Sequence, residues 1–99
     1  MAITGLWNIS IATPIGTQSV VLELTESNGI VEGSARSDAE SVPLTNLILD
    51  GKRLTWKQAI TRPMRLNLIF DVTIEGNTLI GTSKAGMLPA SKVTGTRAV

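Results

Sequence analysis

Apolar and polar residues alternate with a period of two through almost the whole chain, and this pattern constrains the fold more than any other sequence feature. Turn-forming residues interrupt it roughly every 8 to 12 residues, a spacing typical of all-β sandwiches and barrels. The connections are too short for crossovers, so successive strands are expected to pair antiparallel. We predict an all-β, eight-stranded antiparallel up-and-down meander β-barrel in a single domain, residues 1–99. The predicted strands are 3–12, 17–25, 30–37, 42–49, 53–60, 64–74, 78–84 and 91–98.

Two predicted hairpins set the faces of the strands. A tight turn at 75–78 pairs Ile74 with Leu79, and a turn at 26–29 places Leu24 opposite Val31. The motif apolar-x-Gly-Ser/Thr recurs at 31–34, 79–82 and 93–96, with its glycine on the inward face each time. An inward glycine indicates strong coiling or the close approach of a neighbour, and an eight-stranded sheet must coil to close. An open two-sheet sandwich of the same strands is the alternative.

The register of the strand at 42–49 depends on the length of the turn that follows it. Three loop residues at 50–52 pair Ile48 with Leu54 and place Asn46 inside, opposite Trp56. A two-residue loop flips the strand and places Leu47 inside instead, because side chains alternate between the two faces. We favour the first register.

Trp7 and Arg97 are predicted to close one end of the barrel. Trp7 lies in Gly5-Leu6-Trp7 at the start of the first strand, and Arg97 lies in Gly95-Thr96-Arg97 on the last strand. An arginine lying across an indole makes a cation–π contact and keeps donors for nearby carbonyls. This end, the base, also holds the termini and the turns at 26–29, 50–52 and 75–77.

Composition excludes several function classes. The net charge is +1, with 9 basic and 8 acidic residues scattered along the chain, which argues against nucleic-acid binding. The sequence has no cysteine and no histidine, so we predict no disulfide, no metal site and no cofactor. No apolar run approaches the ~18 residues of a membrane span, and no signal-peptide pattern opens the sequence. We expect a cytoplasmic protein that does not enter a membrane.

The end opposite the base, the mouth, is predicted to hold a binding site. Its loops carry apolar side chains at exposed tips, and the inward residues change from apolar at the base to polar above. A mostly apolar cavity with a few polar groups is typical of a small-molecule pocket. The predicted ligand-binding residues are Gln18, Asn46, Trp56, Gln58, Met64, Ser83 and Met87. The alternative is a filled core in which these amides bond one another or a buried water.

Two further functions remain open. An enzyme of the isomerase, cyclase or lyase type could use Asp38 or Glu40 as an acid–base group, if burial near apolar side chains raised the carboxyl pKa. Solvated loop carboxylates are the simpler explanation. Apolar side chains on the outward faces predict a homo-oligomer, and hence an oligomerising module with a filled core as the third function. They are Leu6, Val21, Ile69 and Ile80, joined by Leu47 and Leu49 in the favoured register.

Gly5-Leu6-Trp7, eight meandering strands and Arg97 on the closing strand resemble the calycin superfamily of lipocalins, fatty-acid-binding proteins and avidins. Short strands and tight hairpins are most similar to a streptavidin-like barrel or a short lipocalin-like domain of unassigned function. The resemblance implies a small, often hydrophobic ligand inside the barrel. For Trp7 and Arg97 it implies closure of the base and not ligand contact.

Overall fold

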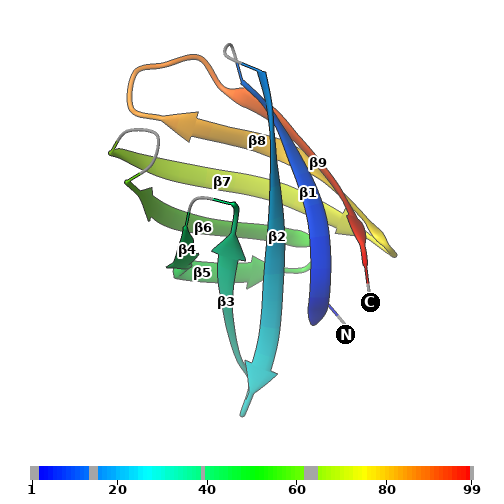
Figure 1. The fold of residues 1–99 in the computed structure, drawn as a ribbon. Helices are drawn as coiled ribbons and strands as arrows, with labels where there is room; N and C mark the ends of the chain where they lie inside the picture. The colour runs from blue at the N-terminus through cyan, green and yellow to red at the C-terminus, as the bar shows by residue number, and fades with distance from the viewer. Residues whose placement is uncertain (1–2, 14–15, 39, 62–64, 99) are drawn as a thin grey trace.

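The computed structural model describes residues 3–13, 16–38, 40–61 and 65–98, and all its regular elements are β-strands (Figure 1). They form one antiparallel sheet in the order β4-β3-β2-β1-β9-β8-β7-β6-β5, rolled into a nearly closed barrel. The predicted all-β, up-and-down architecture is confirmed. The strands are β1 (Gly5–Thr13), β2 (Gly16–Ser27), β3 (Ile30–Arg36), β4 (Ser41–Pro43), β5 (Thr45–Asp50), β6 (Arg53–Ile60), β7 (Leu66–Glu75), β8 (Thr78–Ala85) and β9 (Ser91–Arg97).

Within these ranges the barrel has nine strands instead of the predicted eight, because the segment 42–49 is divided at Leu44. Its first part, β4, pairs with β3, and its second part, β5, pairs with β6. Pro43 ends β4 and has no N–H to extend the ladder. Asn46 then adopts a left-handed φ of 52° beside a β-bulge. These two residues carry the chain from one strand neighbour to the other.

The turn between β5 and β6 contains two residues, so the favoured register of the segment 42–49 is wrong. Asp50 pairs with Arg53 across Gly51 and Lys52, and Leu49, not Ile48, lies opposite Leu54. Leu47 packs against the core, whereas the Asn46 side chain is exposed. Gly51 has a φ of 64°, a conformation that a two-residue hairpin turn requires and glycine adopts easily.

The other two hairpins keep the predicted faces. In the hairpin of β7 and β8, Ile74 pairs with Leu79 as predicted. In the hairpin of β2 and β3, the turn is also only two residues long, so Leu24 pairs with Gly33 instead of Val31. This shift of two residues leaves every side chain on its predicted face, because the side-chain period is two.

The inward glycines allow neighbouring strands to approach closely. A Cβ on Gly33 would lie 2.7 Å from the carbonyl oxygen of Glu23, and one on Gly95 would lie 2.6 Å from a methyl group of Ile9. A Cβ on Gly81 would collide with the backbone of β7. The prediction of close approach from the repeated motif is therefore confirmed.

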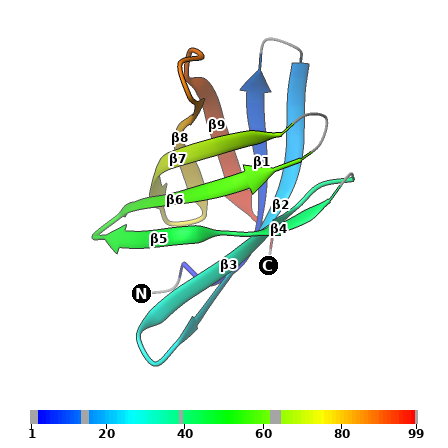
Figure 2. The same cartoon turned by 90° about the vertical axis from the view of Figure 1, so that its left-hand side faces the viewer.

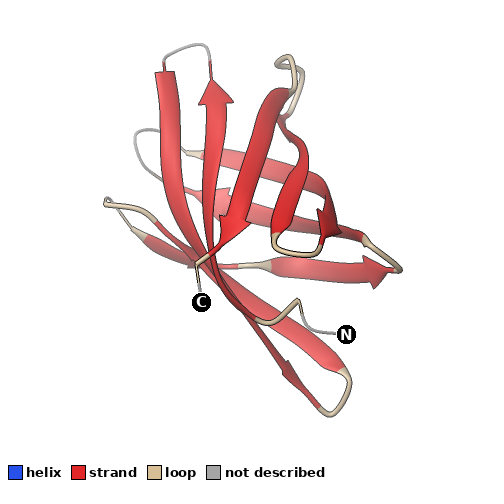
Figure 3. Cartoon of the chain, turned by 90° about the vertical axis from the view of Figure 1, so that its right-hand side faces the viewer, coloured by secondary structure: helices blue, strands red, loops and turns tan. Residues whose placement is uncertain are grey.

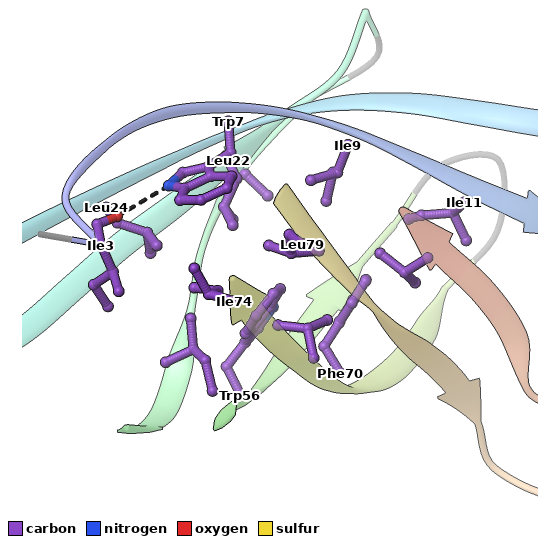
Figure 4. Close-up of a cluster of buried hydrophobic side chains, with 14 residues drawn as sticks. Ile3, Trp7, Ile9, Ile11, Leu22, Leu24, Trp56, Phe70, Ile74 and Leu79 are labelled. Carbon is purple, nitrogen blue, oxygen red and sulfur yellow. Dashed lines mark hydrogen bonds between the residues drawn. The ribbon is translucent and has the colours of Figure 1, made fainter. Parts of the chain in front are cut away.

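The described elements are all strands (Figure 3), and Trp7 and Arg97 meet at the base, where β1 and β9 pair. The guanidinium carbon of Arg97 lies 4.4 Å from the ring centroid of the fully buried Trp7. Arg97 also donates to the backbone oxygen of Thr4 and to Oδ1 of Asn77, the latter at 3.0 Å. The indole Nε1 donates to the carbonyl of Ile3 at 2.9 Å (Figure 4). The predicted contact between the two side chains is present.

The core fills the base and the middle of the barrel. Trp56 and Phe70 stack with ring centroids 4.8 Å apart and planes 8° from parallel, and both are buried (Figure 4). The other side chains with less than 2 % exposure surround them and are apolar. They are Trp7, Leu22, Leu24, Leu54, Leu79, Val72 and Val93.

Candidate functional site

A cavity of about 330 Å³ opens at the mouth of the barrel, above the stacked rings of the core. In Figure 1 the β8–β9 connection at this end lies at the upper left, whereas the β7–β8 turn and both chain ends lie on the right. Most residues that line the cavity are apolar. They lie near the mouth ends of the strands, apart from Leu88 and Pro89, which lie in the β8–β9 connection. The apolar lining residues are Ile11, Val20, Ala35, Val42, Ile60, Leu66, Leu68, Ala85, Leu88 and Pro89.

Gln58 and Ser83 are the two buried polar side chains of the described residues, and both line the cavity. Gln58 lies on β6. Ser83 lies on β8, where it pairs with Phe70 of β7. The Gln58 Oε1 accepts a hydrogen bond from the indole Nε1 of Trp56 at 3.2 Å. This bond orients the amide, so the group that Gln58 can offer to a ligand is its Nε2 donor. The cavity therefore combines a buried amide and a buried hydroxyl with a wall that is mostly apolar.

Glu40 joins two connections at the rim of the mouth. Its carboxylate accepts from the Thr61 hydroxyl at 2.6 Å and from the Thr61 N–H at 2.9 Å. The backbone oxygen of Glu40 also accepts from the Ser37 N–H at 2.9 Å. Both carboxylate oxygens are thus used to hold the β3–β4 connection against the end of β6. Glu40 therefore holds the two connections together at the rim of the cavity.

Three of the seven predicted ligand-binding residues line the cavity, namely Gln18, Gln58 and Ser83. Trp56 does not line it but lies beneath it, where it stacks on Phe70 and orients Gln58. Asn46 and Met87 are exposed and lie outside it, so the expectation that they face the cavity is wrong. Asn46 is displaced by the flipped register of β5. Met64 lies outside the described residues.

The two acidic candidates are separated by the structure. Glu40 lines the rim of the cavity, whereas Asp38 does not. Asp38 is exposed and lies beside Arg36 at a shallow hollow on the outer face of β1 and β2. The two carboxylates therefore do not converge on one point of the cavity. In the described ranges no three acidic side chains are grouped as ligands for a metal ion.

Several lining residues were absent from the predicted site although the alternation that set the core also points to them. Ile11 continues the inward series of Trp7 and Ile9, and Leu66 and Leu68 continue that of Phe70. Leu88 lies in the β8–β9 connection, where the sequence pattern indicates an apolar side chain in a loop and gives no direction for it. The inward positions nearest the mouth are thus predictable as lining once the depth of the filled core is known.

The fold and the cavity define a small antiparallel β-barrel with a filled base and a hollow mouth. In comparisons with known proteins, no family and no curated sequence matches the chain. No helix among the described residues is long and apolar enough to cross a membrane.

Proposed function

We propose that this barrel binds a small, largely apolar organic molecule in the cavity at its mouth. The observation that carries the proposal is the pair of buried polar side chains, Gln58 and Ser83, among the apolar side chains that make up most of the cavity lining. Burying polar groups is costly, and placing them where a ligand can reach them is typical of sites that fix a ligand's orientation. A cytoplasmic location and a calycin-like ancestry, the latter supported by the Trp7–Arg97 contact at the base, are parts of the same proposal.

The cavity indicates the size and polarity of the ligand. About 330 Å³ lies at the small end of the usual range for ligand sites, roughly 300–1,000 Å³. We propose a compact apolar body with one oxygen acceptor, such as a carbonyl or an ether, at its buried end. That acceptor would receive a hydrogen bond from the Gln58 amide or the Ser83 hydroxyl.

The enzyme alternative has less support. Glu40 is the acidic side chain that lines the cavity, and both its carboxylate oxygens accept hydrogen bonds from Thr61. These two bonds give Glu40 a structural role in holding the rim, which accounts for its position there without a catalytic step. We therefore assign Glu40 a structural role at the rim, and we favour a ligand-binding function over an enzymatic one.

The proposal is tested by filling the cavity without changing the outer surface. Ala85 lines the cavity, and its neighbour Lys84 is exposed on the opposite face of β8. We expect wild-type protein to bind the neutral fluorescent probe phenylnaphthylamine, and Ala85→Phe to weaken binding by roughly tenfold or more, since the new ring takes the ligand's space. Lys84→Phe adds the same ring outside and should leave binding unchanged.

Two results would count against the site. Equal binding by Ala85→Phe and wild type would place the probe elsewhere on the protein. No binding of the probe by wild type, together with no ligand in the purified protein, would favour a structural barrel.

A further inference from the structure

Trp56 and Gln58 lie two residues apart on β6, which runs between β5 and β7 (Figure 2). Because side chains alternate along a strand, both point to the same face, and both are buried inside the barrel. Gln58 lines the cavity, whereas Trp56 lies beneath it and stacks on Phe70. These two side chains therefore connect the filled core with the cavity.

The hydrogen bond between the two side chains has only one polarity. The indole Nε1 of Trp56 is a donor and never an acceptor, so the oxygen of the Gln58 amide must face it, at 3.2 Å. The stack on Phe70, with ring planes 8° apart, holds the indole in place. Half a turn of the amide would bring its NH2 group against the indole N–H and set two donors against each other. The amide is therefore held in one orientation.

The NH2 group of Gln58 is the end of the amide that remains for the cavity. Among the described residues, neither this group nor the hydroxyl of Ser83 has a hydrogen-bond partner, and no fully buried side-chain nitrogen or oxygen lacks one. Both groups are therefore reached from the cavity that they line, although the two side chains are only 6 % and 5 % exposed. The amide presents a donor there, whereas the hydroxyl can donate or accept.

We propose that Trp56 determines the polarity of the ligand, because it fixes Gln58 as a donor. The cavity then selects apolar molecules that carry an acceptor and discriminates against those whose polar group is a donor. An acceptor gains a bond to the NH2 group, whereas a donor placed there gives up its bond to water and finds no acceptor. This role rests on the proposed ligand-binding function and adds to it a positioning residue that does not touch the ligand.

Four compounds of similar size test this role. Quinoline carries an acceptor that naphthalene lacks, and indole carries a donor that indene lacks. Because the apolar bodies are matched within each pair, the ratio of the two dissociation constants gives the effect of the polar group. The constants are measured at neutral pH by competition with phenylnaphthylamine. The protein is Ser83→Ala, since the hydroxyl could bond to either kind of group.

In Ser83→Ala we expect quinoline to bind about three- to tenfold more tightly than naphthalene, as one hydrogen bond allows, and indole to bind no more tightly than indene. Adding Trp56→Phe keeps a ring on Phe70 but removes the indole N–H, so the amide can turn its oxygen to the cavity. The preference for indole over indene should then rise about tenfold, while that for quinoline over naphthalene changes less than about twofold. Phe70→Leu is the control, because it loosens the same stack but keeps the N–H, and it should change neither preference.

A general loosening of the site would change both preferences together, so a rise for indole alone identifies the bond to Trp56. Binding of all four compounds with an indole preference that Trp56→Phe leaves unchanged would overturn this role and leave the proposed function intact. Tighter binding of indole than of indene by Ser83→Ala would overturn it too, and this comparison does not depend on the folding of the Trp56→Phe variant. If wild-type protein binds neither phenylnaphthylamine nor any of the four compounds, the proposed function fails and the role of Trp56 fails with it.

Discussion

The base and the mouth of the barrel are built from the same alternating strands, but the base is filled and the mouth is hollow. At the base Trp7, Leu24 and Leu54 are buried against one another in a continuous core. At the mouth the inward residues Leu66 and Leu68 are only half-buried and face a cavity. Stability should therefore depend mainly on the base, whereas the mouth is free to accept a ligand.

The largest effect is expected from Trp7→Ala, which empties the base. Trp7 is fully buried and carries the guanidinium of Arg97 on its ring. Loss of this side chain should lower the free energy of unfolding by about 3–5 kcal/mol, measured by urea denaturation. At low temperature, where the variant is still folded, probe binding at the mouth should persist. A loss below about 1 kcal/mol would show that the base is not the main source of stability.

The same substitution at two depths compares the regions directly. Leu54→Ala at the base should cost about 2–5 kcal/mol, because Leu54 is completely buried. Leu68→Ala at the mouth should cost about 1 kcal/mol, because part of that side chain already faces the cavity. Urea denaturation of both variants measures the difference. Equal costs would mean that the mouth is as tightly packed as the base.

The smallest effect is expected on the outer wall, from the ion pair of Arg53 and Asp71. Arg53 donates to both carboxylate oxygens of Asp71, at 2.9 and 2.6 Å, and this holds the pKa of Asp71 below its usual value. The pair therefore stabilises the fold at neutral pH, and this contribution is lost as the pH falls through the lowered folded-state pKa. Because both side chains are exposed, the contribution is small.

Asp71→Asn should therefore lower the denaturation midpoint slightly at neutral pH and leave it unchanged in acid. Denaturation curves of the variant and wild type across this pH range measure the difference. A difference that stays constant with pH would assign it to something other than the charge of Asp71.

The base was more predictable from sequence than the mouth, and the reason is physical. Alternation fixes which face a residue occupies, and errors of two residues, such as that in the β2–β3 hairpin, leave the faces unchanged. An error of one residue exchanges the faces, and this is why Asn46 was assigned to the interior in place of Leu47. The length of the turn at Gly51-Lys52 decides that register. The residues at 50–52 suit a two-residue loop and a three-residue loop equally well, so the sequence does not fix the length.

The candidate site was predicted in part. Gln58 and Ser83 were found because they are polar residues at inward positions, which alternation identifies. The bond between Glu40 and Thr61 joins residues 21 positions apart in the sequence, and it forms only once the two connections lie side by side. Met87 was assigned to the wall because it is apolar, but nothing local to the sequence shows that it is fully exposed while Leu88, itself 56 % exposed, lines the cavity.

Native mass spectrometry of the protein as purified tests the central claim, a ligand in the mouth, most directly. The account predicts that each 10.5 kDa chain carries one small molecule, or takes up one phenylnaphthylamine when it is added. The bound mass should be present in Lys84→Phe and absent from Ala85→Phe. A wild-type chain that shows only its own mass, with and without added probe, would contradict the account.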